Sequence, residues 1–334
     1  MRAFFIRRYG GPQVLEEGEL PPAPLGPRDV RITVHAASVN PVDWKIRQGK
    51  TKVLLPYRFP LVLGNDCSGV VREVGAEVTA FQPGDAVYSR LGKDRIGAFA
   101  EEVVAAESNV APKPAKLSHV EAASLPLVAL TAWQALVDVA KVQPGQTVLV
   151  HAGSGGVGSA AVQLAKHLGA KVVSTASAKN VELVRGFGAD TVVDYNAQRF
   201  EEGVRDVDAV LDGVGMDNVV RSFRCVRPGG IVISITDGPD VAFAREWGVS
   251  PLLWPVFWLL SAKAHRAARR HQATYRYWFM RSSGEQLRHL TTLVEQGVLR
   301  PHVDRVFPFA QTKEAVAYAE SGKARGKVVV SLRE

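Results

Sequence analysis

Cysteine is scarce in this chain of 334 residues. Its two cysteines, Cys67 and Cys225, are far apart and form neither a disulfide framework nor a CxxC metal pair. This usage suits a reducing compartment, and we predict the cytoplasm. The first residues, MRAFFIRRYGG, are too few and too basic after their apolar residues for a signal peptide, so a first strand is expected.

Acidic residues are absent between Glu246 and Glu285. The chain has a formal net charge of +8, and most of this excess lies in that interval. A general nucleic-acid binder would spread its basic residues along a groove with exposed aromatic side chains, so no nucleic-acid partner is expected. The basic residues of the interval are Lys263, Arg266, Arg269, Arg270, Arg276 and Arg281.

An apolar run of membrane-spanning length is also missing. The almost wholly apolar part of Val249–Arg270 is too short to cross a bilayer and contains Pro251 and Pro255. The segment is predicted to be mostly helical. Three interpretations are open: a helix that caps the substrate pocket, a subunit interface, or a membrane-surface helix with a basic flank. The first two are favoured, so the apolar face is expected to be covered by the substrate domain or by the second subunit of a homodimer.

The hydrophobic pattern changes near residue 121. Before it, Val30, Ile32 and Val34 alternate with polar residues, and turn signals recur, which is typical of a β-rich domain. After it, strands and helices alternate, which predicts a parallel, doubly wound sheet. The predicted fold class is α/β, with a Rossmann domain inserted in a β-rich domain. The predicted domains are 1–121 completed by 298–334, and 122–297 with an apolar and basic insertion at about 240–274.

A glycine-rich stretch, HAGSGGVGSAAVQLAKHLGA at 151–170, follows an apolar strand and opens an amphipathic helix. Its glycines have GxGxxG spacing: Gly153 permits a tight turn, Gly155 lets the backbone approach a pyrophosphate, and Gly158 lets the helix pack close to the sheet. The free N–H groups and the dipole at the helix start favour a phosphate there. The predicted dinucleotide loop is Gly153, Ser154, Gly155, Gly156, Val157 and Gly158.

The second strand of this βαβ unit is followed by no acidic residue. An NAD-preferring site places Asp or Glu there, about 20 residues past the glycines, to bind the ribose 2′-OH. This chain has Ser177 and Lys179 instead. A hydroxyl and an ammonium attract a 2′-phosphate, which an acid would repel, so NADPH is the predicted cofactor.

Motifs along nearly the whole chain resemble the medium-chain dehydrogenase/reductase superfamily. Within it, the chain is most similar to the zinc-free quinone oxidoreductase and enone reductase branch. The resemblance implies a GroES-like catalytic domain in addition to the Rossmann domain. The motifs are SVNPVDWKIRQG at 38–49, PLVLGNDCSGVVREVG at 60–75, FQPGDAVY at 81–88, LTAWQAL at 130–136, GFGADTVVDY at 186–195 and SGKARGKVVV at 321–330.

The resemblance implies further cofactor contacts. Thr131 matches a threonine that lies beside the nicotinamide, and Tyr195 matches a third contact near the 2′-phosphate. Val214 and Ile235 stand in loops after the fourth and fifth strands, at the carboxyl ends where ligands of open α/β sheets bind. Three basic residues near the C-terminus are Lys323, Arg325 and Lys327. Each of them either closes over the cofactor or lies at a solvated strand entrance, and both interpretations are open. Among the three, Arg325 is the predicted cofactor contact.

No metal is expected. Zinc-dependent members of the superfamily hold catalytic zinc with Cys and His at positions matched here by Asn40 and Asn65. Neutral amides are poor zinc ligands, and Cys67 alone does not make a site. The four clustered cysteines of a structural zinc lobe are also absent.

NADPH without a flavin implies two-electron hydride transfer. On a quinone or enone, charge grows on a carbonyl oxygen that needs hydrogen-bond donors. Asn40 resembles the family's active-site asparagine and has an amide N–H to offer, although an Asn–Pro turn is an equal interpretation. Asp43, Lys45 and Tyr57 are candidates to line the pocket, and Lys45, Tyr57 or water is available as the proton donor. Asn40 and Tyr57 are the predicted catalytic residues.

The predicted function is therefore an NADPH-dependent, zinc-independent oxidoreductase that acts on a small-molecule quinone or α,β-unsaturated carbonyl. Two alternatives are open. One is a metal-free reductase of another carbonyl class. The other is a non-catalytic NADPH-binding protein that senses redox state or has a structural role.

Overall fold

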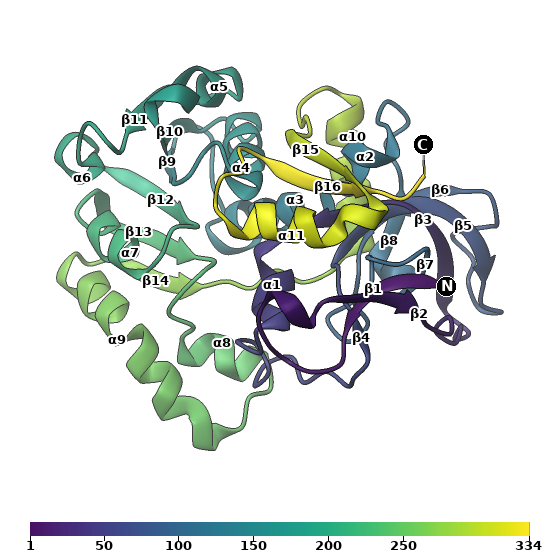
Figure 1. Ribbon diagram of the computed structural model, residues 1–334. Helices are drawn as coiled ribbons and strands as arrows, with labels where there is room; N and C mark the ends of the chain where they lie inside the picture. The colour runs from purple at the N-terminus through teal and green to yellow at the C-terminus, as the bar shows by residue number, and fades with distance from the viewer. Residues whose placement is uncertain (334) are drawn as a thin grey trace. The chain divides into compact units, whose positions relative to one another are not determined.

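The computed structural model describes residues 1–333. The chain forms two compact units (Figure 1). One consists of Met1–Leu130 together with Arg281–Glu334, and the other of Thr131–Met280. The boundaries fall at Leu130 and Arg281, whereas the sequence pattern places them near residues 121 and 298.

The unit made from the two ends of the chain is β-rich. Its larger sheet has seven strands in the order β15-β16-β3-β5-β6-β8, with β7 also paired to β3, and its smaller sheet has the order β2-β1-β4. The alternation in β3 (Asp29–Val39) has the predicted effect, since Val30, Ile32 and Val34 are fully buried. The other strands are β1 (Arg2–Ile6), β2 (Glu16–Glu19), β4 (Leu61–Val62), β5 (Asp66–Val74), β6 (Ala86–Arg90), β7 (Glu102–Ala106), β8 (Val110–Pro112), β15 (Val303–Pro308) and β16 (Lys327–Ser331).

Helix α10 (Gly284–Glu295) belongs to this β-rich unit, although the sequence pattern assigns it to the Rossmann domain. Its first residue packs on β8: a Cβ on Gly284 would lie 2.4 Å from the carbonyl oxygen of Val110. The Tyr88 hydroxyl of β6 donates to the Leu287 carbonyl at 2.8 Å. These long-range contacts leave no trace in local periodicity. The other helices include α1 (Pro41–Arg47), α2 (His119–Ala123) and α11 (Thr312–Glu320), and α3 (Pro126–Trp133) crosses the boundary at Leu130.

The second unit is a Rossmann-like domain, which confirms the predicted fold class. Its six strands pair in the order β11-β10-β9-β12-β13-β14, and every pair is parallel. Neighbours on either side of β9 are therefore reached by crossovers through helices, as in a doubly wound sheet. The strands are β9 (Thr147–Val150), β10 (Lys171–Ala176), β11 (Thr191–Asp194), β12 (Val207–Asp212), β13 (Val226–Ser234) and β14 (Thr274–Tyr277).

The helices of this unit follow the predicted alternation with the strands. A π-helical stretch (Gln134–Val139) continues α3 and leads toward β9. The remaining helices are α4 (Gly156–His167), η4 (Ala178–Asn180), α5 (Val181–Gly186), α6 (Phe200–Gly203), α7 (Met216–Ser222), α8 (Val241–Glu246), η5 (Pro251–Leu253) and α9 (Trp254–Arg270).

The apolar and basic segment forms η5 and α9, so its predicted helical character is confirmed. Within this chain the apolar side chains Leu252 and Leu259 are 89% and 69% exposed. Cover by a second subunit stays a prediction. The covered face is a different one that includes Phe257 and the small residue Ala264. Among the helices of residues 1–333, none combines the length and hydropathy needed to span a bilayer.

Candidate functional site

The glycine loop joins β9 to α4. Ala152 has a left-handed backbone, with φ of 55°, and the Gly153 N–H donates to the Thr175 carbonyl of β10 at 3.0 Å. Gly155 is the N-cap of α4, whose first turn holds no acidic residue. The loop therefore presents a helix N-terminus with no competing carboxylate, which is a favourable place for a phosphate group.

The three motif glycines are needed for different reasons. Gly158 has the predicted role: a Cβ there would lie 2.1 Å from the Ala152 carbonyl oxygen, so only glycine lets α4 start this close to the loop. A Cβ on Gly155 would meet only that same oxygen, at 3.3 Å. At Gly153 the fold adds a second reason for glycine. The left-handed backbone of this loop is at Ala152, and a Cβ on Gly153 would lie 2.2 Å from Ser174 Oγ.

Substitution of Gly158 by alanine is expected to cost about 1–3 kcal/mol of stability and to weaken dinucleotide binding, because the new methyl group overlaps backbone that cannot turn aside. The matched control is Gly186→Ala in α5, where a Cβ would meet nothing within 4 Å. Urea unfolding and cofactor titration measure both effects. Equal behaviour of the two variants would contradict the packing role of Gly158.

The carboxyl ends of β10 and β11 bring together three predicted cofactor residues. Ala176 and Asp194 are register partners in these parallel strands, so Ser177 and Lys179 after β10 lie near Tyr195 after β11. Lys179 and Tyr195 are exposed, and Tyr195 keeps 57% of its surface accessible. The buried Asn180 donates from Nδ2 to both Ser154 Oγ and Ser177 Oγ at 3.2 Å. Asn180 thus ties the glycine loop to the end of β10, a contact that sequence reasoning missed.

The loop after β12 is held by a buried carboxylate. Asp212 Oδ2 accepts from the backbone N–H groups of Gly215 and Val214 at 2.9 and 3.2 Å, and Oδ1 accepts from Asn218 Nδ2 at 2.7 Å. Burial raises the pKa of Asp212 to about 6, although these hydrogen bonds lower it. Val214 is consequently displayed at the surface, 58% exposed, at the carboxyl end of the sheet. Ile235 follows the neighbouring strand β13 and is half-buried.

Two of the predicted cofactor contacts, Thr131 and Arg325, do not lie at the carboxyl ends of the Rossmann strands. Thr131 is a buried residue of α3 at the first position of the Rossmann unit. Arg325 is exposed just before β16 and belongs to the β-rich unit. Asn40 and Tyr57 belong to the β-rich unit as well. Apart from Arg325, the cofactor residues named from the sequence all lie within the Rossmann unit.

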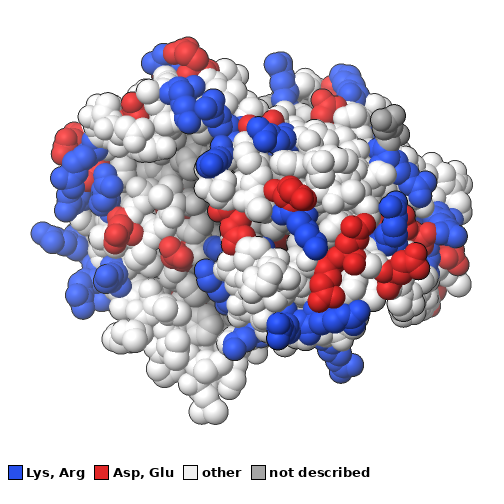
Figure 2. Space-filling view, viewed as in Figure 1, with Lys and Arg blue, Asp and Glu red and all other residues white. Residues whose placement is uncertain are grey.

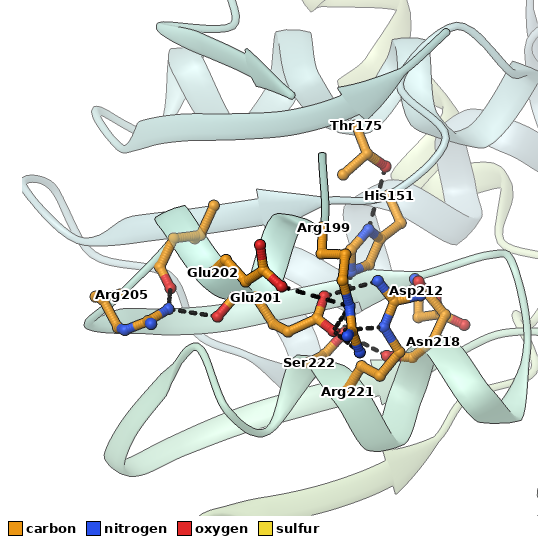
Figure 3. A network of polar contacts seen from close by, with 11 residues as sticks. His151, Thr175, Arg199, Glu201, Glu202, Arg205, Asp212, Asn218, Arg221 and Ser222 are labelled. Carbon is orange, nitrogen blue, oxygen red and sulfur yellow. Dashed lines mark hydrogen bonds and ion pairs between the residues drawn. The ribbon is translucent and has the colours of Figure 1, made fainter. Parts of the chain in front are cut away.

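A buried polar network begins at His151, between β9 and the glycine loop (Figure 3). His151 Nε2 lies 3.0 Å from Ser222 Oγ, and its Nδ1 lies 3.1 Å from Thr175 Oγ1. Because the Ser222 hydroxyl donates to the Asn218 carbonyl, Nε2 carries the hydrogen toward Ser222. In the same view Arg221 donates two hydrogen bonds to the buried Glu201, at 2.7 and 2.9 Å, which ties α7 to α6.

His151 is expected to make the stability of the protein depend on pH. Burial lowers its pKa to about 3, so the unfolded chain, near 6.5, binds more protons between these values. Stability is therefore fully present above about pH 6.5 and is lost as pH falls, by up to about 1.4 kcal/mol per pH unit. Urea unfolding between these limits should show a shallower slope for His151→Gln. Parallel curves for both proteins would contradict this assignment.

A second buried cluster occupies the β-rich unit, around Asn40 at the start of α1. Asn40 Nδ2 donates to Asp66 Oδ2 at 2.9 Å and to the Ser38 carbonyl at 3.3 Å, and its Oδ1 accepts from Lys327 Nζ at 2.6 Å. Its backbone N–H donates to Asp43 Oδ2 at 2.7 Å. All polar atoms of this side chain therefore have partners. Donation from Asn40 to a substrate oxygen stays a prediction, and it requires one of these bonds to be exchanged.

The cluster combines buried charges of both signs. Burial raises the pKa of Asp43 to about 7 and also raises the pKa of Asp66, while it lowers the pKa of Lys327. Lys327 Nζ lies 3.9 Å from Asp66 Oδ2 and also donates to the Val39 carbonyl. Lys327 is thus not at a solvated strand entrance, which corrects one of the two interpretations drawn from the sequence. Sequence reasoning missed this ion pair because its members are far apart along the chain.

The amides at the positions matched to zinc ligands are engaged as hydrogen-bond donors. Asn65 Nδ2 donates to Asp43 Oδ1 at 2.7 Å, and Asn40 Nδ2 donates to Asp66 as described. Cys67 is a fully buried free thiol. Across residues 1–333, the His, Cys, Asp and Glu side chains form no group of three or more that could hold a metal ion.

Tyr57 and Arg90 complete the polar groups around this cluster. The Tyr57 hydroxyl donates to the Lys93 carbonyl at 2.7 Å, and burial raises its pKa above the ordinary value. Arg90, which sequence reasoning missed, is 2% exposed and donates from Nη1 to Ser282 Oγ at 3.2 Å. Burial lowers the pKa of Arg90, whereas the charge of Asp66 raises it. Because burial raises the pKa of Tyr57, its hydroxyl keeps its proton at neutral pH.

Comparison with known proteins agrees with this architecture. The alcohol dehydrogenase GroES-like domain family matches residues 26–115, and the zinc-binding dehydrogenase family matches residues 187–330. The Mus musculus NAD(P)H oxidoreductase RTN4IP1, mitochondrial, is 36% identical over 357 residues, covering 99% of this chain and 89% of the mouse protein. The Arabidopsis thaliana NADPH-dependent alkenal/one oxidoreductase, chloroplastic, is 34% identical over 341 residues, covering 99% of this chain and 79% of the plant protein.

A solved structure is similar along the whole length. The quinone oxidoreductase from Coxiella burnetii matches with a TM-score of 0.87 at 33% identity, covering 100% of this chain and 99% of the bacterial one. The chain therefore belongs to the medium-chain dehydrogenase/reductase superfamily and is an oxidoreductase of that type, which confirms the resemblance seen in its motifs.

Proposed function

We propose that the protein is an NADPH-dependent, zinc-independent oxidoreductase that transfers hydride to quinones or α,β-unsaturated carbonyls. The observation that carries the proposal is the end of β10, where Ser177 and the exposed Lys179 stand near Tyr195 and no acid follows the strand. The names of the relatives, an alkenal/one oxidoreductase and a quinone oxidoreductase among them, support the substrate class.

The residues of the Rossmann unit fit this cofactor. The N-terminus of α4 has no acid in its first turn and would hold the pyrophosphate, with Gly155 leaving room for close approach. Lys179 and Ser177 would hold the 2′-phosphate, and Tyr195 lies at the end of the adjacent strand. Val214 and Ile235 stand at the carboxyl ends of β12 and β13. When bound, NADPH supplies the hydride.

In the β-rich unit, Tyr57 and Asn40 are the proposed catalytic residues. Tyr57 is a neutral O–H donor for an oxygen on which negative charge grows, provided that its hydrogen bond to the Lys93 carbonyl is exchanged for one to that oxygen. Asn40 Nδ2 donates two hydrogen bonds, and the one to the Ser38 carbonyl, at 3.3 Å, is longer than the one to Asp66. Asn40 would donate to the substrate by exchanging this longer bond for one to the substrate oxygen. The oxygen is then protonated by Tyr57 or by water.

Zinc independence rests on the donor set. The amides of Asn40 and Asn65 point N–H groups at Asp66 and Asp43, and the ammonium of Lys327 is bonded to Asn40. A divalent cation placed there would meet amide hydrogens and a positive charge instead of thiolate or imidazole. Positive charge beside the carboxylates is already supplied by Lys327.

Steady-state oxidation of NADPH against a panel of quinones and enones tests the proposal. Turnover with either substrate class, unaffected by chelators and accompanied by substoichiometric zinc on elemental analysis, is the expected result. Binding of NADPH with no turnover on the panel would favour the non-catalytic alternative. Activity lost on chelation and restored by zinc would refute zinc independence, and activity confined to other carbonyls would favour the other reductase class.

The assembly and the location of the protein stay predictions. We propose a homodimer, which sedimentation analysis can test. We also propose the cytoplasm, although the names of two relatives place them in the mitochondrion and the chloroplast. Localisation of the tagged protein decides between these compartments.

A further inference from the structure

Helix α9 has two opposite faces along its length. Residues three or four apart on a helix share a face. Phe257, Ser261, Ala264 and Ala268 form the buried face, and they pack within the unit against β14, α7 and α8. The opposite face consists of Val256, Leu259, Lys263, Arg266 and Arg270, all of them exposed.

The exposed face is divided along the helix axis into an apolar part and a basic part. At its N-terminal end, Val256 and Leu259 are joined by four more exposed apolar residues, of which Trp258 is 62% exposed. The C-terminal half carries only positive charge. Figure 2 shows the same division: the lower left projection is free of charged atoms, and Lys and Arg atoms gather further up that side. The other three exposed apolar residues are Leu252, Leu253 and Leu260.

We propose that this surface, Leu252–Arg270, binds the surface of a membrane that contains anionic lipids. The apolar end would enter the boundary between headgroups and acyl chains, where Trp side chains are favoured. The basic half would face the lipid phosphates. At 1.5 Å per residue, Leu259 and Arg270 are about 16 Å apart along the axis, so an inclined helix reaches both layers.

Charge decides between this occupant and a second copy of the chain. Residues 247–284 contain no Asp or Glu. Antiparallel pairing of two copies of this face would set the basic half of each against the apolar half of the other, with no acid from the segment to offset the charge. Parallel pairing would set like charges together. An anionic lipid surface supplies negative charge and apolar volume at once, and it accommodates a projecting apolar end without a preformed groove.

The test is co-sedimentation of the full-length protein with vesicles of phosphatidylcholine, with and without phosphatidylglycerol. We expect binding only to the anionic vesicles, and its loss as salt rises from 0.1 to 1 M, where the Debye length falls from about 10 Å to about 3 Å. A triple variant that removes three positive charges should weaken partitioning on the order of 100-fold. This variant is Lys263→Gln, Arg266→Gln and Arg270→Gln.

Two further variants make the test specific. Trp258→Ser with Leu259→Ser should abolish insertion while the charge is kept. A matched control removes three exposed lysines elsewhere and should bind like the wild type: Lys52→Gln, Lys171→Gln and Lys313→Gln. All variants should keep the wild-type melting temperature and the turnover of a water-soluble substrate, because none of these residues belongs to the proposed site.

Several results would overturn the proposal. Absence of binding to anionic vesicles is one, and equal binding to neutral vesicles is another. Loss of binding in the control triple variant is a third, because it would show a general charge effect. A dimer in solution that Trp258→Ser with Leu259→Ser dissociates, combined with no vesicle binding, would assign the face to a second copy. Altered substrate affinity without dissociation or vesicle binding would make the segment a pocket cap.

Discussion

Replacement of Lys179 by alanine is expected to raise the KM for NADPH about 10- to 100-fold, because a charge-assisted hydrogen bond to the 2′-phosphate is worth about 1.5–3 kcal/mol. The KM for NADH should change far less, because NADH has a hydroxyl where NADPH has that phosphate. Lys179 is exposed at the end of β10, so its removal leaves the buried Asn180 contacts in place.

The informative quantity is the ratio of kcat/KM for the two cofactors. Lys171→Ala is a matched control, since it removes an exposed lysine at the opposite, amino end of the same strand. A wild-type preference for NADH, or an equal loss for both cofactors in Lys179→Ala, would contradict the assignment. Ser177→Ala should show the same selectivity with a smaller effect, because it removes a neutral donor.

The sequence predicts the Rossmann unit well because its signals are local. Most of its strands are short apolar runs, each from β9 to β13 is followed by a helix, and the glycine loop marks where α4 begins. One reason for glycine within the loop, at Gly153, depends on a strand two elements away. The need for glycine there arises from Ser174 Oγ, which only the folded β10 brings into place.

The sequence predicts less about groups that act through distant partners. Lys327 and Asn40 are 287 residues apart, and no periodicity links them. The resemblance pointed to Lys327 as a cofactor-closing or solvated residue, whereas β16 pairs with β3 and buries it beside Asp66. For helix α9, the sequence predicts the secondary structure but not the packing. Its pattern predicts a helix, yet which face is covered depends on packing against β14 and α7.

Removal of the Lys327 ammonium is expected to cost about 3–5 kcal/mol of stability, because it leaves buried carboxylates without their positive partner. Lys327→Met keeps the length of the side chain but takes away the charge and the bonds to Asn40 and Val39. Asp66 then retains its donors from Ser38 and the backbone N–H of Leu127, which limits the loss.

The exposed Lys323→Met is the control, and its effect should stay within about 0.5 kcal/mol, as for most surface substitutions. If the cost comes from an unpaired charge, Asp66→Asn added to Lys327→Met should recover part of the stability, giving a coupling energy of about 0.5–3 kcal/mol in the double-mutant cycle. Urea unfolding of the four proteins at one pH measures it. Additive losses would mean that Lys327 acts through packing alone. Coupling of the expected sign would show that a lysine of the last strand neutralises the buried carboxyl group beside Asn40.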